Sequence, residues 1–349
     1  MATLWFLLVA VMLVAYVVLD GFDLGVGAIS QWVANTPEEH TLVRRSIGPI
    51  WDANEVWLLA AGGTLYFAFP ALYAASFSGF YLPLMMVLWL LIGRALGLEL
   101  RAHLGEELLA DACDTIFMVS SLLLPVFFGA ALGNVIRGVP LDSDGTFFLP
   151  LWTNFRPGPE PGVLDWYTVT CGVVALVAIA THGAHYLALR VTGELNARAR
   201  RIARLGTYLL PPLTLLSLGA TLVVRPTVVS NFRSHPAGLL IPLAVASSLV
   251  VMILSARRGQ ERTSFFASVT YLVSMLGGAA FALFPVLLPA TGDPARSLTV
   301  TTAATGSYAM GVALGWWPIA FLLVAATFTH LYRTFRGKLT AGESDGYHQ

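Results

Sequence analysis

The chain contains little charge and little cysteine for its length. Only 11% of its 349 residues are charged and 56% are hydrophobic, whereas a soluble domain is usually about 25% charged. This composition excludes an ordinary water-exposed surface. Basic and acidic residues number 20 each, so the net charge gives no support to a nucleic-acid partner, and we expect none. Cys113 and Cys171 lack CxxC or CxxCH spacing, which excludes a disulfide framework and a covalently attached haem.

Long apolar runs take the place of charge. Nine of them approach the roughly 20 residues that cross a bilayer as a helix. They cover approximately residues 4–30, 51–73, 77–100, 115–136, 164–189, 205–224, 239–255, 265–288 and 307–332. A segment in lipid must satisfy its own backbone hydrogen bonds, and the alternating pattern of a barrel is absent. The sequence therefore predicts an all-α membrane protein with about nine transmembrane helices in one bundle, residues 1–336, followed by a polar cytoplasmic tail, residues 337–349.

The positions of the basic residues predict the orientation. Fourteen of the 20 Lys and Arg residues follow the first, third, fifth, seventh and ninth runs, whereas five lie in the other connections. Cytoplasmic loops carry the excess of Lys and Arg, so the N-terminus is predicted outside and the C-terminus in the cytoplasm. The first run has no basic n-region and no small-residue cleavage site, so we expect it to be a retained span.

Charged residues inside the first three runs are the candidate functional residues. They are Asp20 and Asp23 in the first run, Asp52 and Glu55 beside Trp51 in the second, and Arg94 and Glu99 in the third. A charge at bilayer depth costs about 2.5–3.5 kcal/mol on insertion scales, so it usually faces a partner, water or a pathway. With a rise of about 1.5 Å per residue, all of them except Asp20 are predicted in the cytoplasmic third of the membrane.

Two interpretations of these charges stay open. Carboxylates from three helices at one depth could form a cytoplasmic proton inlet, tuned by a charged Arg94. Alternatively, Arg94 pairs with Asp23, Asp52 or Glu99 and locks the helices together. Asp20 and Glu55, each taken alone, are better explained as interfacial caps or polar helix ends.

His182 and His185 are three residues apart in the fifth run and could present two imidazoles on one helix face. Haem or metal ligation is one interpretation, but a satisfied polar patch is the favoured one. Gly25 and Gly27 permit close backbone approach of another helix. No strand or phosphate-loop lysine accompanies them, so a nucleotide site is not expected. The nine Trp residues fit interfacial belts and do not by themselves define a quinone pocket.

Two stretches carry a family resemblance. Residues 19–27 (LDGFDLGVG) and 48–58 (GPIWDANEVWL) resemble signature segments of cytochrome bd-type quinol oxidase subunit II. Shorter likenesses are Gly62-Gly63, residues 67–70, 73–74 and 77–81, Arg94, Gly97, Arg101, residues 193–195, Phe284-Pro285 and residues 297–299. The resemblance extends over essentially the whole chain, and its most specific part is the first hundred residues.

The resemblance implies a nine-helix subunit in a prokaryotic cell membrane, paired with a haem-bearing subunit I of similar fold. In that family, subunit I carries the haem b and haem d groups and the quinol site, and the complex reduces oxygen and generates membrane potential. Subunit II is not catalytic alone. It supports its partner, contributes to cytoplasmic proton delivery and can hold a structural quinone, and small single-span subunits can attach to the complex.

The resemblance also assigns residues. Family proton-path carboxylates correspond to Asp23, Asp52 and Glu99, where some relatives have Asp in place of the last, and Arg94 and Trp51 match neighbouring positions. The histidine pair matches no family haem ligand. We expect the first few helices, with their small residues, to pack against subunit I. A secondary transporter or channel, and a purely structural partner, are the rival functions, since intramembrane charges also mark solute routes.

Overall fold

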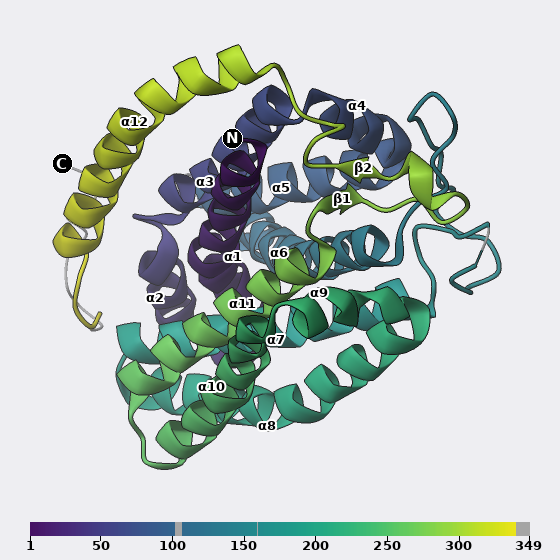
Figure 1. Ribbon diagram of the computed structural model, residues 1–349. Helices are drawn as coiled ribbons and strands as arrows, with labels where there is room; N and C mark the ends of the chain where they lie inside the picture. Colours follow the sequence, from purple (N-terminus) through teal and green to yellow (C-terminus); the bar gives the residue numbers. More distant parts are fainter. Residues whose placement is uncertain (102–106, 159, 340–349) are drawn as a thin grey trace.

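The computed structural model describes residues 1–101, 107–158 and 160–339, and it is a bundle of long helices (Figure 1). The long helices are α1 (Ala2–Val33), α3 (Trp51–Ala68), α5 (Tyr81–Arg101), α6 (Glu107–Arg137), α7 (Trp166–Arg190), α8 (Gly193–Val224), α10 (Leu240–Arg257), α11 (Glu261–Leu283) and α12 (Ser307–Thr334). Within the described ranges, 8 helices are long and apolar enough to cross a membrane, and a bent helix pair brings the total to 9. The predicted all-α membrane fold is confirmed.

Helix α1 lies in the middle of the bundle, where α3, α6, α7 and α11 pack around it (Figure 1). Its contact with α7 depends on glycine, as the sequence predicted. A Cβ atom at Gly25 would lie 2.8 Å from the Cα of Gly183, closer than real Cβ contacts allow. The two backbones therefore meet directly, and this fixes the depth of the polar residues that precede Gly25 on α1.

The second span is bent, which differs from the straight helix expected for residues 51–73. Helix α3 ends at Ala68, and α4 (Pro70–Gly79) leaves at 118° to it. Proline has no backbone N–H and cannot continue a preceding helix, but it is well suited to begin one. Phe69 takes a non-helical conformation between them (φ −134°, ψ 63°). The bend therefore separates the polar start of α3 from the apolar α4.

Several helix ends lie outside the apolar runs. Helix α6 begins at Glu107 and α8 at Gly193, well before the predicted residues 115 and 205. Hydropathy predicts only the part of a helix that lies in lipid, whereas the helix itself continues as far as its backbone hydrogen bonds do. The eighth run ends early instead: α11 stops at Leu283, and Val286–Leu288 forms strand β1, which pairs antiparallel with β2 (Leu298–Thr299).

Short elements cover the ends of the bundle. Helix α2 (Pro37–Ile47) follows α1, and its N-terminus is capped by Thr36, whose side chain accepts a hydrogen bond from the Glu39 N–H at 3.3 Å. Helix α9 and three 3₁₀ turns occupy Ser230–Ser234, Pro226–Val229, Pro236–Leu239 and Pro294–Arg296. Helix α7 begins with a capping box in which Asp165 and Thr168 bond reciprocally.

Helix α12 lies along the edge of the molecule (Figure 1), and Met310 is its only buried side chain. Beyond it, the Leu339 N–H donates to the Arg190 carbonyl at 2.6 Å, which holds the chain against the end of α7. The predicted polar tail begins at Gly337, and its residues 340–349 lie outside the described residues.

Candidate functional site

Asp20 and Arg94 form a buried ion pair between α1 and α5. The Arg94 guanidinium donates to both carboxylate oxygens of Asp20, at 2.9 and 2.5 Å, and both residues are 0% exposed. Such a two-pronged pair is the strong form of a charge-assisted hydrogen bond. The interpretation of Asp20 as an interfacial cap is therefore wrong, because the close packing around Gly21 and Gly25 buries this part of α1. Arg94 pairs with Asp20 and not with Asp23, Asp52 or Glu99, the acids expected for an ion pair.

Asp23 is also 0% exposed but has different neighbours. Its Oδ2 accepts a hydrogen bond from the Asn54 side-chain amide at 2.7 Å. Its Oδ1 is buried and has no hydrogen-bond partner among the described residues. The same amide nitrogen donates to the Leu19 carbonyl at 3.3 Å, and the Tyr332 hydroxyl donates to the Asn54 Oδ1 at 2.8 Å. One carboxylate oxygen of Asp23 thus accepts a hydrogen bond from the Asn54 amide, whereas the other has no hydrogen-bond partner among the described residues.

The other predicted residues lie around Asp23 and Arg94 and differ in their solvent exposure. Glu55 is half-buried, and its Oε2 lies 3.8 Å from the Arg94 guanidinium. Arg94 also lies over the Trp51 ring, 5.5 Å from its centroid. The Trp51 indole N–H donates to Glu99 at 3.3 Å.

Asp52 and Glu99 are exposed at the edge of this cluster, and Asp52 is close enough to interact electrostatically with Glu55. The structure therefore places Asp23 and Arg94 inside the chain and Asp52 and Glu99 on its surface. Glu55 connects the two groups, so it is not merely a polar helix end. Such an arrangement gives a surface-to-interior series of carboxylates.

Helical spacing brings the buried groups together. Tyr16, Asp20 and Asp23 are four and three residues apart and therefore share one face of α1. The Tyr16 hydroxyl and the Arg94 Nε are buried without a hydrogen-bond partner among the described residues, like the Asp23 Oδ1. Three such atoms therefore lie around one ion pair, and of these the Asp23 Oδ1 and the Tyr16 oxygen can accept a hydrogen bond.

Asn54 and Tyr332 are functional candidates that the sequence reasoning did not select. Asn54 lies at the start of the second apolar run and Tyr332 at the end of the ninth, and neither side chain is charged. An amide inside an apolar run is a usable signal, because it requires hydrogen-bond partners at that depth. Tyr332 could not be found in this way, since tyrosine is ordinary at a membrane interface.

His182 and His185 form the predicted satisfied polar patch. Ring nitrogens of His182 lie 2.7 Å from the Ser268 hydroxyl and 2.9 Å from the Val18 carbonyl. The Nε2 of His185 lies 3.1 Å from the Thr207 hydroxyl. Both nitrogens of the first imidazole are thus engaged. No group of three or more metal-ligating side chains occurs within the described ranges.

A second buried ion pair lies at the other end of the bundle. The Arg137 guanidinium pairs with Asp165, donates to the Gly162 carbonyl at 3.0 Å and to the Asn134 side chain at 2.6 Å. Asp165 is also the N-cap of α7. The carboxylate and the guanidinium of this pair both have hydrogen-bond partners, so the network anchors the loop before α7. Unlike Asp23, Asp165 has no buried oxygen without a hydrogen-bond partner among the described residues.

Comparisons with known proteins show the family of this chain. The family model described as cytochrome bd terminal oxidase subunit II matches residues 1–335. The cytochrome bd-I ubiquinol oxidase subunit 2 of Escherichia coli (strain K12) is 30% identical over 354 residues, covering 93% of this chain and 91% of that protein. The cytochrome bd ubiquinol oxidase subunit 2 of Bacillus subtilis (strain 168) is 30% identical over 313 residues, covering 88% of each.

A solved structure shares the fold. The bd oxidase from Geobacillus thermodenitrificans contains a chain that superimposes with a TM-score of 0.73 at 17% identity, covering 96% of this chain and 98% of that one. The relatives are bacterial, and the spanning helices of this chain are those of a multi-pass membrane protein of the respiratory chain. The chain belongs to the cytochrome bd terminal oxidase subunit II family.

Proposed function

We propose that this chain is the haem-free subunit of a quinol:oxygen oxidoreductase and that it passes cytoplasmic protons to a haem-bearing partner, subunit I. The partner's haem b and haem d groups supply the electron transfer and oxygen reduction. Two features of this chain are consistent with a non-catalytic role: His182 and His185 both have hydrogen-bond partners, and Asp20, Asp23, Glu55 and Arg94 lie close together. Quinol and oxygen are then substrates of the complex, and this chain is not catalytic alone.

The proposed route follows the graded burial of the carboxylates. Asp52 and Glu99, exposed on this chain, receive protons on the cytoplasmic side that the basic loops predict. Half-buried Glu55 comes next, beside Arg94 at 3.8 Å. Asp23 is the innermost acid and the one that holds the proton before it leaves for the partner. Arg94 keeps Asp20 ionised throughout, because separating a buried ion pair is costly.

The observation that carries this proposal is that the buried Oδ1 of Asp23 has no hydrogen-bond partner among the described residues. An isolated buried carboxylate is far more costly than a neutral carboxylic acid. Asn54 gives Asp23 one hydrogen bond, but no guanidinium donates to it, in contrast to Asp20. The Oδ1 is thus the atom on which a proton is held, and a change of charge in the partner subunit can draw it off.

Asp23→Asn tests the proposal in the assembled complex. Asparagine has the same shape and keeps an oxygen for the Asn54 amide, so assembly and haem content should stay normal, but it cannot take up a proton. Quinol-dependent oxygen consumption and proton uptake into liposomes should fall together by at least tenfold, since general proton transfer typically contributes 10²–10⁴-fold. Asp144→Asn, in an exposed loop, is the matched control and should change neither rate.

Asp52→Asn tests the entry of the route. Because Asp52 is exposed and not part of the buried network, the variant should assemble with normal haem content and lose turnover. Normal turnover with normal proton uptake in both the Asp52 and the Asp23 variants would reject proton delivery. It would leave the purely structural role, for which the Asp20–Arg94 pair is the supporting observation.

The proposal includes two further components that the family resemblance implies. A structural quinone bound to this chain is tested by organic extraction of the purified, detergent-washed complex, which should yield quinone without added substrate. Small single-span subunits are tested by gel analysis of the same preparation. A complex of two polypeptides without extractable quinone would contradict both components and leave the proton route untouched.

A further inference from the structure

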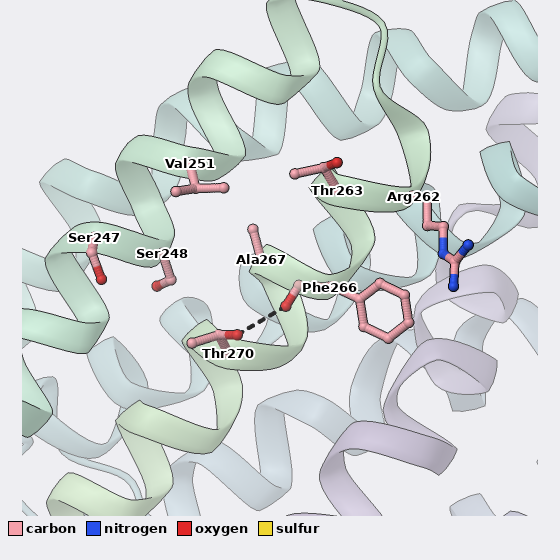
Figure 2. A pocket seen from close by; sticks show the side chains of 8 residues that line it. All are labelled: Ser247, Ser248, Val251, Arg262, Thr263, Phe266, Ala267 and Thr270. Carbon is pink, nitrogen blue, oxygen red and sulfur yellow. Dashed lines mark hydrogen bonds between the residues drawn. The ribbon is translucent and has the colours of Figure 1, made fainter.

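Helices α10 and α11 enclose a groove of about 440 Å³ on the outer surface of the bundle (Figure 2). This volume lies within the range of about 300–1,000 Å³ that is usual for ligand sites. Ser247 and Thr270 line it and are exposed, and Ser248 and Ala267 form its floor and are buried. None of these residues belongs to the polar cluster on α1, α3 and α5, so the groove is a separate feature.

The groove is apolar despite its hydroxyl groups. The Ser247 hydroxyl donates to the Ala244 carbonyl at 3.1 Å and the Ser248 hydroxyl to the Val245 carbonyl at 2.7 Å. The Thr270 hydroxyl donates to the Phe266 carbonyl at 3.0 Å, as the dashed line in Figure 2 shows. Three of the four lining hydroxyls, those of Ser247, Ser248 and Thr270, are bonded to their own helix. Apart from Thr263, which lies next to Arg262, the surface presented to a ligand is therefore mainly methyl and methylene. Such a surface accepts a hydrocarbon chain.

One end of the groove is cationic. Arg262 is exposed there, its guanidinium lies 5.8 Å from the centroid of the Phe266 ring, and it forms no ion pair with the described residues. Arg257 and Arg258 lie in the same turn between the helices. The acid of this turn, Glu261, is already bound by Lys338 at 2.9 Å and Asn196 at 2.8 Å. Positive charge is therefore in excess at this end.

The length of the groove matches one leaflet. Arg262 and Thr270 are eight residues apart on α11, or about 12 Å at 1.5 Å per residue. Half of the roughly 30 Å hydrocarbon core is about 15 Å. A hydrocarbon chain that starts beside Arg262 therefore lies in the groove for most of a single leaflet. A transmembrane helix of another subunit would need a contact surface continuing through both leaflets.

We propose that this groove binds an anionic phospholipid from the leaflet that the α10–α11 turn faces. Its phosphate lies at Arg262, with Arg257 and Arg258 adding to the attraction, and one acyl chain lies along Ser248, Ala267 and Thr270. The positive charge favours an anionic lipid over a neutral quinone. The tail of a quinone would fit the groove, but its uncharged ring would not be attracted by three arginines. The lipid fills the space between the two helices and ties their turn to the membrane surface.

Native mass spectrometry of the complex with its partner subunit tests the site. The complex is reconstituted in nanodiscs of phosphatidylcholine with phosphatidylglycerol, released, and scored for retained phosphatidylglycerol. Arg262→Gln should lower retention about fivefold, the effect expected for one arginine near an anionic surface. Arg201→Gln is the matched control, because Arg201 is exposed on α8 at the same basic end but away from the groove. It should retain the wild-type amount.

Ser247→Leu combined with Thr270→Leu tests the chain-binding part of the groove. Leucine at these exposed, lipid-facing positions should leave the fold intact while filling the groove, and retained phosphatidylglycerol should fall as it does in Arg262→Gln. Equal retention in wild type and both groove variants would overturn the proposal. Retention of a quinone or a small polypeptide that only the leucine variant displaces would also overturn it, because the occupant would then belong to another class.

Discussion

Asp20 and Asp23 are chemically identical and one helical turn apart, yet their surroundings give them different roles. Asp20 is neutralised by a bidentate Arg94, whereas Asp23 receives an amide and keeps one oxygen open. The difference arises from the neighbouring helix that each side chain meets, α5 for Asp20 and α3 for Asp23. In the proposed route, Asp20 therefore holds the helices together while Asp23 carries the proton.

Asp20→Asn should damage the fold rather than the proton route alone. It leaves the Arg94 guanidinium buried without its counter-ion, and breaking a buried pair by removing one partner costs about 3–5 kcal/mol. We expect a complex with sharply lower yield and haem content, measured by visible spectroscopy of membranes and by thermal unfolding in detergent. Wild-type thermal stability in this variant would show that Arg94 does not depend on Asp20.

Tyr332→Phe should weaken the support of Asp23 with little change in stability. The variant loses the hydroxyl that orients the Asn54 amide, a net effect of about 1 kcal/mol. Turnover should fall less than in Asp23→Asn. If Tyr332 acts through Asp23, adding the tyrosine change to Asp23→Asn should cause no further loss.

Tyr308→Phe is the control for this experiment, because Tyr308 lies on the same helix and is 85% exposed. It should leave turnover unchanged. Independent, multiplicative losses in the double variant of Tyr332 and Asp23 would contradict the coupling through Asn54.

The sequence predicted the acids of the site better than their pairing. Charges in apolar runs stand out at any residue, so Asp20, Asp23, Glu55 and Arg94 were all identifiable. Which acid meets Arg94 depends on the rotation of α1 about its axis, and that rotation is set by the contact of Gly25 with α7, far away in sequence. Local spacing contains no information on it.

At the scale of single elements, Glu39 joins the N-terminal turn of α2 to α8, while Arg44 pairs with Asp114 of α6 at the other end of the helix. Glu39 accepts a hydrogen bond from the Asn35 N–H at 2.7 Å and pairs with Arg198 of α8, whose Nε also donates to the Val33 carbonyl at 2.6 Å. Partial burial raises the pKa of Glu39, but these hydrogen bonds and the Arg198 charge outweigh burial, so its pKa lies below the ordinary value of 4.5.

The attachment of α2 should therefore depend on pH. A depressed pKa contributes stability that is complete above pH 4.5 and is lost as the pH falls through the lower value of the folded protein. Hydrogen exchange of residues 36–47 should accelerate on acidification in that window. Glu39→Gln should exchange faster at neutral pH and respond less to acid, while Glu38→Gln, which is exposed in the same turn and is not paired with Arg198, should keep the wild-type exchange rate at neutral pH. An unchanged acid response in Glu39→Gln would refute this attachment.

Element boundaries show why hydropathy gave the spans but not the shapes. The apolar run of residues 51–73 is continuous, so nothing in its hydropathy marks the end of α3 at Ala68; only Pro70 does. The polar start of α8 at Gly193–Arg204 is invisible to an apolar scan because it projects beyond the lipid depth. Helix α2 is likewise too short and polar for such a scan, although its Thr36-Pro37 start is a regular N-terminal signal.

At the scale of the whole molecule, large apolar side chains are exposed on most of the long helices, as expected for a chain that lies in lipid. Two helices differ from the other long helices because they carry the exposed acids of the proposed proton route. These are α3, which carries Asp52, and α5, which carries Glu99. Protons that enter at Asp52 and Glu99 pass inward to Asp23 in the proposed route and must then cross into the partner subunit, so we expect α3 and α5 to border the contact with subunit I. This agrees with the expectation that the first few helices form the subunit contact.

Alanine substitutions distinguish a protein-facing from a lipid-facing surface. Leu59 on α3 and Leu215 on α8 are matched, being 71% and 69% exposed on this chain. Lipid refills the space of a truncated side chain, whereas a protein partner leaves a cavity that costs about 2–5 kcal/mol for Leu→Ala. In the double variant Leu59→Ala on α3 and Trp89→Ala on α5, subunit I should therefore dissociate at a lower detergent concentration or temperature. Dissociation is measured by co-purification and by haem absorbance. Leu215→Ala should keep the wild-type complex. If the α8 variant loses the partner and the α3–α5 variant keeps it, the subunits meet on the opposite face, and the exposed acids Asp52 and Glu99 cannot lead protons toward subunit I.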